Sequence, residues 1–341
     1  MRNSKYSIIL LCVITGMVML LGSGCAAPRW QEAASEAAPP VDLRKTISVN
    51  GIERSYLLHL PPGQDSAHPV PLLILLHSGG GKGDDLEKIF GMNGLADREG
   101  FAVVYPDGFS HHWNDGRNVE RFRAHRQDID DAGFIAALID QLVESAGVDR
   151  HRVYAAGVAE GGMMAHRLAC ELADRIAAVA PVIAAMPESL AGGCFPARSI
   201  PVLMINGTDD AIVPWAGGEV RVGSRALGRV MSVSGTVSFW VSQNGCSNTP
   251  SITDEPDLDP DDGTRVRKQV YRRCAGSVEV VLYEVLGGGH AWPSGRNSAL
   301  SGTAPAAGRS NRDADTAALM WEFFKNYRLE RLPPTRRESA P

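Results

Sequence analysis

The stretch VYAAGVAEGGMMAHRL, residues 153–168, decides the fold of this chain. An apolar run at residues 153–156 predicts a strand, and the apolar spacing over residues 161–173 predicts a helix. Between them lies a turn in which Gly157 and Gly161 flank Ala159. Glycines at these two places let a strand and a helix approach closely and hold the central side chain in an exposed, strained position.

The same alternation of short apolar runs and helical periodicity extends along the chain in both directions. It predicts a mainly parallel central sheet with helices on both faces, an α/β fold whose solidly apolar strands are covered on both sides. The predicted strands are residues 46–49, 55–59, 72–76, 102–105, 153–156, 177–181, 202–205 and 278–283. The predicted helices are residues 86–99, 130–146, 161–173, 233–243 and 313–326.

Two of the loops that follow these strands carry an acid and a histidine. Asp210 follows the strand at residues 202–205, and His290 follows the last strand between three glycines and Trp292. Alone, Asp210 would be an ordinary solvated turn carboxylate. The chain order of glycine turn, acid and histidine is that of α/β-hydrolases, in which a serine occupies the centre of the turn. We therefore predict a catalytic Asp210–His290 pair beside a vacant nucleophile position at Ala159.

The loop after residues 72–76 reads HSGGG and resembles a glycine-rich oxyanion loop. The backbone N–H groups of Ser78, Gly79 and Glu160 are the expected donors to a carbonyl oxygen that develops negative charge. A phosphate-binding interpretation is weaker, because no G-K-[ST] sequence follows and Lys82 comes directly after the glycines.

These motifs together resemble one family. From about residue 45 to residue 327 the chain is similar to the secreted polyhydroxybutyrate depolymerase and feruloyl esterase-like family of α/β-hydrolases. The resemblance implies hydrolysis of carboxylic esters by serine, aspartate and histidine, with Asp210 and His290 as two of the three. The chain departs from the family at Ala159, at Glu160, where asparagine is usual, and at Asn206, where histidine is common. The segments that carry the likeness are HSGGG (77–81), WNDGR (113–117), GGMM (161–164), NGTDDAIVP (206–214), NGC (244–246) and GGHAWP (288–293).

Three interpretations of the missing hydroxyl remain open. The first is a binding or regulatory pseudoenzyme whose ester or glycan cleft is lined by Trp113, Asn114 and Trp292. The second is an active esterase in which His290 activates water directly, or in which another nucleophile replaces the serine. The third is an inactivated variant of an active esterase. We favour the first, with a small ester, a polyester or a plant polysaccharide ester as ligand and with no cofactor. The oligomeric state is left open.

The N-terminus predicts export. Arg2 and Lys5 precede an apolar run at residues 6–21, and the small residues that follow end in Cys25 like a bacterial lipobox. We expect a signal peptide over residues 1–25, with either lipidation of Cys25 and membrane attachment or simple cleavage. The product is an envelope lipoprotein, for example of the outer membrane, or a secreted protein. Residues 26–44 are predicted to be a flexible tether, residues 45–330 the hydrolase domain, and residues 331–341 a disordered tail.

Four cysteines remain after the signal region, and export allows them to form disulfides. Among three possible connectivities we predict the two most local, Cys170–Cys194 and Cys246–Cys274. A metal site is not expected, because the chain has no C-x-x-C and no nearby histidine pattern. The net charge of -5 gives no basic stripe and does not favour nucleic acid.

Overall fold

The computed structural model describes residues 38–65, 67–293 and 308–330. The predicted signal peptide with Cys25 and the predicted C-terminal tail lie outside the described residues, as does most of the predicted tether.

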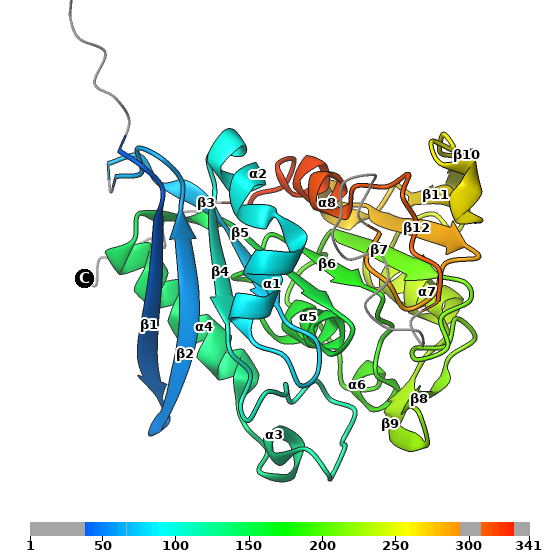
Figure 1. Cartoon of the computed structure of the whole chain (residues 1–341), viewed down its shortest axis with the longest axis horizontal. Coiled ribbons are helices and arrows are strands. Elements are labelled where there is room, and N and C mark those ends of the chain that lie inside the picture. The colour runs from blue at the N-terminus through cyan, green and yellow to red at the C-terminus, as the bar shows by residue number, and fades with distance from the viewer. Residues whose placement is uncertain (1–37, 66, 294–307, 331–341) are drawn as a thin grey trace, which may run out of the picture. The chain divides into compact units, whose positions relative to one another are not determined.

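The described part of the chain is built on a ten-stranded sheet (Figure 1). Its six central strands, β4, β3, β5, β6, β7 and β12, are parallel, and the strands at both edges are antiparallel. This is the α/β-hydrolase arrangement that the sequence predicted. In spatial order the strands are β1 (Val41–Val49), β2 (Ile52–Leu60), β4 (Ala102–Pro106), β3 (Val70–Leu76), β5 (Val148–Val158), β6 (Ala178–Val182), β7 (Val202–Gly207), β12 (Val280–Leu286), β11 (Arg265–Tyr271) and β10 (Ser251–Asp254).

Helices cover both faces of this sheet. Along β3, Leu72 and Ile74 pack in one core with α4, α5 and α7, whereas Leu73 and Leu75 pack in a second core with α1, α2 and α8. This alternation follows from the two-residue period of a strand. The helices are α1 (Gly83–Phe90), α2 (Met92–Glu99), α3 (Arg123–Arg126), α4 (Asp131–Ser145), α5 (Glu160–Glu171), α6 (Glu188–Ala191), α7 (Val233–Gln243) and α8 (Thr316–Phe324), with short 3-10 turns at Pro260–Asp262 and Ala275–Ser277.

Several predicted boundaries were wrong. The single helix expected over residues 86–99 is two helices, because Gly91 adopts a left-handed conformation with φ 60° between α1 and α2. The first strand begins at Val41, inside the stretch predicted to be a tether. Sequence periodicity also missed the polar edge strands β10 and β11 and a separate hairpin, β8 (Gly218–Val222) and β9 (Arg225–Val230).

Both predicted disulfides are confirmed. Cys170 at the end of α5 is bonded to Cys194, and Cys246 after α7 is bonded to Cys274. Each closes a loop of moderate length, and such bonds persist in oxidising compartments.

His166 of α5 is buried and neutral. Its Nδ1 accepts a hydrogen bond of 3.0 Å from the indole N–H of Trp240, and burial lowers its pKa to about 3. An unfolded histidine titrates near pH 6.5, so between about pH 6.5 and 3 the unfolded chain binds one proton more than the folded chain. The contribution of His166 to stability is therefore complete above pH 6.5 and decreases as the pH falls toward 3.

We expect this histidine to lower the free energy of unfolding by about 2 kcal/mol between pH 7 and pH 5. This pH-dependent change in the free energy of unfolding should disappear in His166→Gln. The glutamine side chain cannot take up a proton, and its oxygen can still accept the indole N–H of Trp240. Urea unfolding of both proteins at pH 7, 6 and 5 measures it. Equal pH slopes in the two proteins would contradict the assignment.

Candidate active site

The turn between β5 and α5 has the geometry of a nucleophile elbow. Ala159 adopts φ 52° and ψ -112°, a strained conformation for a residue with a side chain. Its N–H donates to the carbonyl of Val182 at 3.0 Å. A Cβ on Gly157 would lie 2.2 Å from the backbone oxygen of Gly161, and one on Gly161 would lie 2.2 Å from that of Leu76. The two glycines are therefore required for this turn, as predicted.

Asp210 and His290 are joined as predicted. They follow β7 and β12, which are neighbouring parallel strands, so their loops meet at one edge of the sheet. His290 Nδ1 lies 2.8 Å from one carboxylate oxygen of Asp210. The other oxygen accepts the N–H groups of Ile212 and Val213, at 2.8 Å each. Because Nδ1 faces the acid, the Nε2 edge of the imidazole is the one left for chemistry.

A cavity of about 540 Å³ brings the predicted centre together. Ser78, Gly79, Ala159, Glu160 and His290 all line it. The rest of its wall consists of arginines, one histidine and apolar side chains, and one part of it comes from the β8–β9 hairpin. These further lining residues are His112, Arg117, Arg121, Phe122, Met163, Ile212, Val213, Val220, Val222, Arg225 and Leu227.

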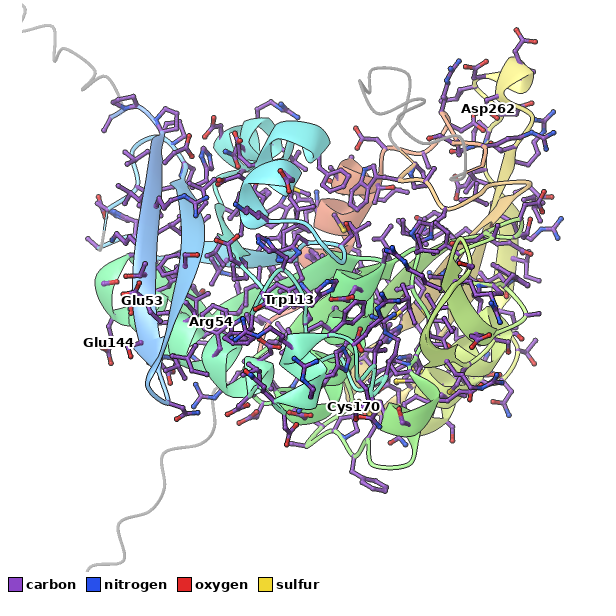
Figure 2. All side chains as sticks on the ribbon, turned by 60° about the horizontal axis from the view of Figure 1, so that its bottom comes forward. Glu53, Arg54, Trp113, Glu144, Cys170 and Asp262 are labelled. Carbon is purple, nitrogen blue, oxygen red and sulfur yellow. A yellow bond between two sulfur atoms is a disulfide. The ribbon has the colours of Figure 1, made fainter. Side chains whose placement is uncertain are left out.

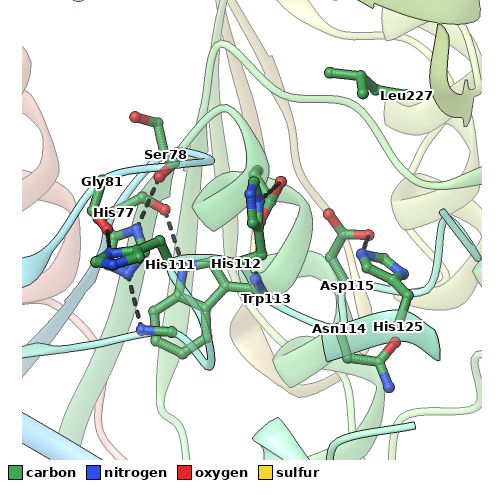
Figure 3. A network of polar contacts seen from close by, with 12 residues as sticks. His77, Ser78, Gly81, His111, His112, Trp113, Asn114, Asp115, His125 and Leu227 are labelled. Atoms are coloured by element: carbon green, nitrogen blue, oxygen red, sulfur yellow. Dashed lines mark hydrogen bonds and ion pairs between the residues drawn. The ribbon is translucent and has the colours of Figure 1, made fainter. Parts of the chain in front are cut away.

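His77 braces the predicted oxyanion loop (Figure 3). Its Nδ1 lies 2.8 Å from the carbonyl oxygen of Ser78, and its Nε2 accepts the N–H of Gly108 at 2.8 Å. The pair of bonds fits a neutral ring that donates from Nδ1, and burial lowers the pKa of His77 accordingly. Across the part of the chain that the structure describes, no backbone acceptor takes the N–H of Gly79 or Glu160. These donors remain available to a ligand oxygen.

The carboxylate of Glu160 is fully engaged by protein groups. It accepts the N–H of Trp113 at 2.8 Å, lies 3.1 Å from His112 Nδ1 and lies 2.9 Å from the guanidinium of Arg117. Burial alone would raise the pKa of Glu160, but the His112 hydrogen bond and the Arg117 charge outweigh it and hold the pKa below its ordinary value. A carboxylate held in this way is a poor replacement nucleophile, which agrees with the expectation that the backbone of Glu160, not its side chain, serves the site.

Arg117 is the centre of this buried network, which sequence reasoning missed. It donates to Asp115 at 2.8 Å, to Glu160 at 2.9 Å and to the carbonyl of Leu227 at 2.9 Å. Burial lowers the pKa of Arg117, but the two carboxylates more than compensate and raise it. The network therefore ties the elbow to the β4–α3 loop and to the β8–β9 hairpin. The signal available in the sequence was the acid beside the elbow together with the closely spaced Asp115 and Arg117.

The predicted ligand contacts of Trp113, Asn114 and Trp292 were wrong, because none of the three lines the cavity. Trp113 is fully buried in the interior near Arg54 (Figure 2), and its indole N–H donates to the carbonyl of His77 at 3.0 Å. Asn114 donates its side-chain amide to the Asp128 carboxylate and to the carbonyl of Ile129, both at 3.0 Å, in the segment after α3. Trp292 packs on the ring of Phe90, and the two ring centroids lie 4.1 Å apart. All three are packing residues.

Within the described ranges, no group of three or more His, Cys, Asp or Glu side chains could hold a metal ion. Over the same residues, none of the helices combines the length and apolar character that a membrane crossing requires.

The comparisons with known proteins agree with this geometry. A family model described as esterase PHB depolymerase matches residues 54–219. The chain is also 33% identical to a putative esterase, NocK, of Nocardia uniformis subsp. tsuyamanensis over 292 residues, which cover 83% of this chain and 84% of the relative. The chain belongs to the PHB depolymerase esterase family. This esterase-family protein is therefore an α/β-hydrolase whose elbow holds alanine.

More distant relatives extend the likeness. The protein is 30% identical to feruloyl esterase B of Piromyces equi over 249 residues, which cover 71% of this chain and 44% of that larger relative. Among solved structures it resembles an acetyl xylan esterase from Aspergillus awamori, with a TM-score of 0.51 and 14% identity over 73% of this chain and 94% of that one. At that identity the structural match shows the shared fold alone.

Proposed function

We propose that this esterase-family protein binds ester ligands in the cavity beside His290 and performs little or no hydrolysis through a catalytic triad. One observation carries the proposal. The elbow backbone and the Asp210–His290 pair are both in place, yet the side chain at the tip of the elbow, Ala159, has no atom that can be acylated.

The covalent route needs a hydroxyl that His290 can deprotonate and that then bears the acyl group. Removing a triad serine costs a known protease about 10⁶ in kcat, and the oxyanion donors and substrate binding retain about 10³ to 10⁴ over the uncatalysed rate. Glu160 does not supply a substitute, because its carboxylate is held by three protein groups. Weak activity at most is the expected behaviour.

A second candidate function is a slow esterase in which His290 activates water directly. It is favoured by the Asp210 hydrogen bond at Nδ1, which leaves the opposite ring nitrogen to act as a base toward the cavity. The free N–H groups of Gly79 and Glu160 would stabilise the oxyanion in the same way as in the serine mechanism.

The proposed ligands are small carboxylic esters, a polyester or plant polysaccharide esters. This class is supported by the family and by relatives whose names specify feruloyl and acetyl xylan esters. The proposed location is outside the cytoplasm, either as a lipoprotein anchored through Cys25 or as a secreted protein. The two disulfides support export.

A direct test measures hydrolysis of 4-nitrophenyl butyrate and methyl ferulate by the purified parent protein and by His290→Ala. We expect the parent to exceed the uncatalysed rate by no more than about 10⁴-fold, while calorimetry detects ester binding to both proteins. Strong activity of the parent that is lost in His290→Ala would overturn the pseudoenzyme, because His290 would then act as the base for an attacking water or for a nucleophile that replaces the serine.

A further inference from the structure

Among the residues that the structure describes, two arginines in the cavity wall have no protein partner. Arg121, in the loop before α3 (Arg123–Arg126), and Arg225, at the start of β9, both line the cavity. Within the described residues, neither forms a salt bridge or a side-chain hydrogen bond. Two other arginines of the same hairpin behave differently, since Arg221 pairs with Glu219 and Arg229 pairs with Glu188 at 2.8 Å. Of the three arginines that line the cavity, Arg117 is held by Asp115 and Glu160, so Arg121 and Arg225 are the two left unpaired within the described residues.

Among the described residues that line the cavity, no carboxylate is free to neutralise them. Glu160 is the one acid among the described lining residues, and its oxygens are taken by Arg117, His112 and a backbone N–H. Asp115 and Asp210 are not among the described lining residues. The carboxylate of Asp115 binds Arg117, and that of Asp210 binds His290. The charge that the cavity presents to a ligand is consequently positive, although the whole chain has a net charge of -5.

Most of the other side chains in the wall are apolar. Phe122, Met163 and the adjacent Ile212 and Val213 come from three places around the elbow, and the hairpin adds Val220 and Leu227. A ligand that fits this lining has an apolar body, an ester group near Ala159 and His290, and an anionic group that reaches the arginines. Guanidinium groups bind carboxylates through paired, charge-assisted hydrogen bonds.

We infer that the ligands of this cavity are esters that carry a separate carboxylate, recognised by Arg121 and Arg225. The inference rests on the proposed ester-binding function and narrows its substrate class. The carboxylate can lie on either side of the ester bond, as in a hemi-ester of a dicarboxylic acid or in an ester of an alcohol that bears an acid, such as a uronic acid residue.

Two isosteric pairs of esters test this inference and separate the two sides. For the acyl side, the mono-4-nitrophenyl ester of glutaric acid is compared with the corresponding ester of glutaric monoamide. For the alcohol side, 4-acetoxybenzoate is compared with 4-acetoxybenzamide. Binding to the parent chain is measured by calorimetry, and kcat/KM is measured with the Ala159→Ser variant. Both are repeated in Arg121→Gln/Arg225→Gln and in the control Arg229→Gln, which removes one exposed charge outside the cavity.

For one pair, we expect the carboxylate to be preferred over the amide about tenfold at low salt, with a smaller preference at 0.5 M salt because exposed charges are screened. The double variant should lose the preference and retain the neutral amide reaction, whereas Arg229→Gln should keep it. Equal use of acid and amide in both pairs would overturn the anionic specificity alone. If the protein neither binds nor hydrolyses any of the four esters, the proposed ester-binding function is overturned as well.

Discussion

Replacing Ala159 by serine is expected to raise kcat for 4-nitrophenyl butyrate by at least about 10³-fold. The elbow already holds residue 159 at φ 52°, at the edge of the cavity that His290 lines. A hydroxyl there would meet an imidazole oriented by Asp210 and the free N–H groups of Gly79 and Glu160. A pre-steady-state burst of about one nitrophenolate per chain would identify the acyl-enzyme.

The matched control is Ala159→Ser combined with His290→Ala, which keeps the new hydroxyl and removes its base. It should return the rate to that of the parent, because removing one member of a triad costs about as much as removing all. A folded Ala159→Ser protein with no gain in rate would show that the site has changed beyond the loss of the hydroxyl. It would contradict the assignment of residue 159 as the nucleophile position of a catalytic triad.

Arg117→Met is expected to lower the free energy of unfolding by about 3–5 kcal/mol at pH 7. The substitution leaves Asp115 and Glu160 buried without their shared cation and breaks the bond to the carbonyl of Leu227. Urea unfolding followed by intrinsic fluorescence measures the change. The β8–β9 hairpin should also become more accessible to proteases, because Arg117 is one of the groups that hold it.

Arg229→Met is the control, because it removes a solvent-exposed ion pair with Glu188 and should cost at most about 1 kcal/mol. The pH dependence gives a second check. In the parent the lowered pKa of Glu160 adds stability above the unfolded pKa and loses it as the pH falls. In Arg117→Met the two carboxylates lack their cation, so their protonated forms are favoured. The difference in free energy of unfolding between the parent and Arg117→Met should therefore decrease toward pH 4. Similar losses in both arginine variants would refute the role of the network.

The predictable part of the site depends on local sequence. Gly157, Gly161 and the helix that follows them fix the elbow, because a Cβ at either glycine would lie only 2.2 Å from a backbone oxygen. The positions of Asp210 and His290 follow from parallel strands, whose carboxyl ends share one edge of the sheet. The correct disulfide pairing also followed from short separations along the chain.

The sequence by itself therefore determined the fold, the acid and histidine, and the missing hydroxyl at Ala159. The tertiary structure decided which side chains surround them. It buried Trp113 and placed Arg225, from a hairpin that periodicity did not reveal, on the cavity wall. It also joined Arg117 to Glu160 across 43 residues of chain. Local patterns encode turns and strand order, whereas burial and the choice of charged partners depend on how distant segments pack together.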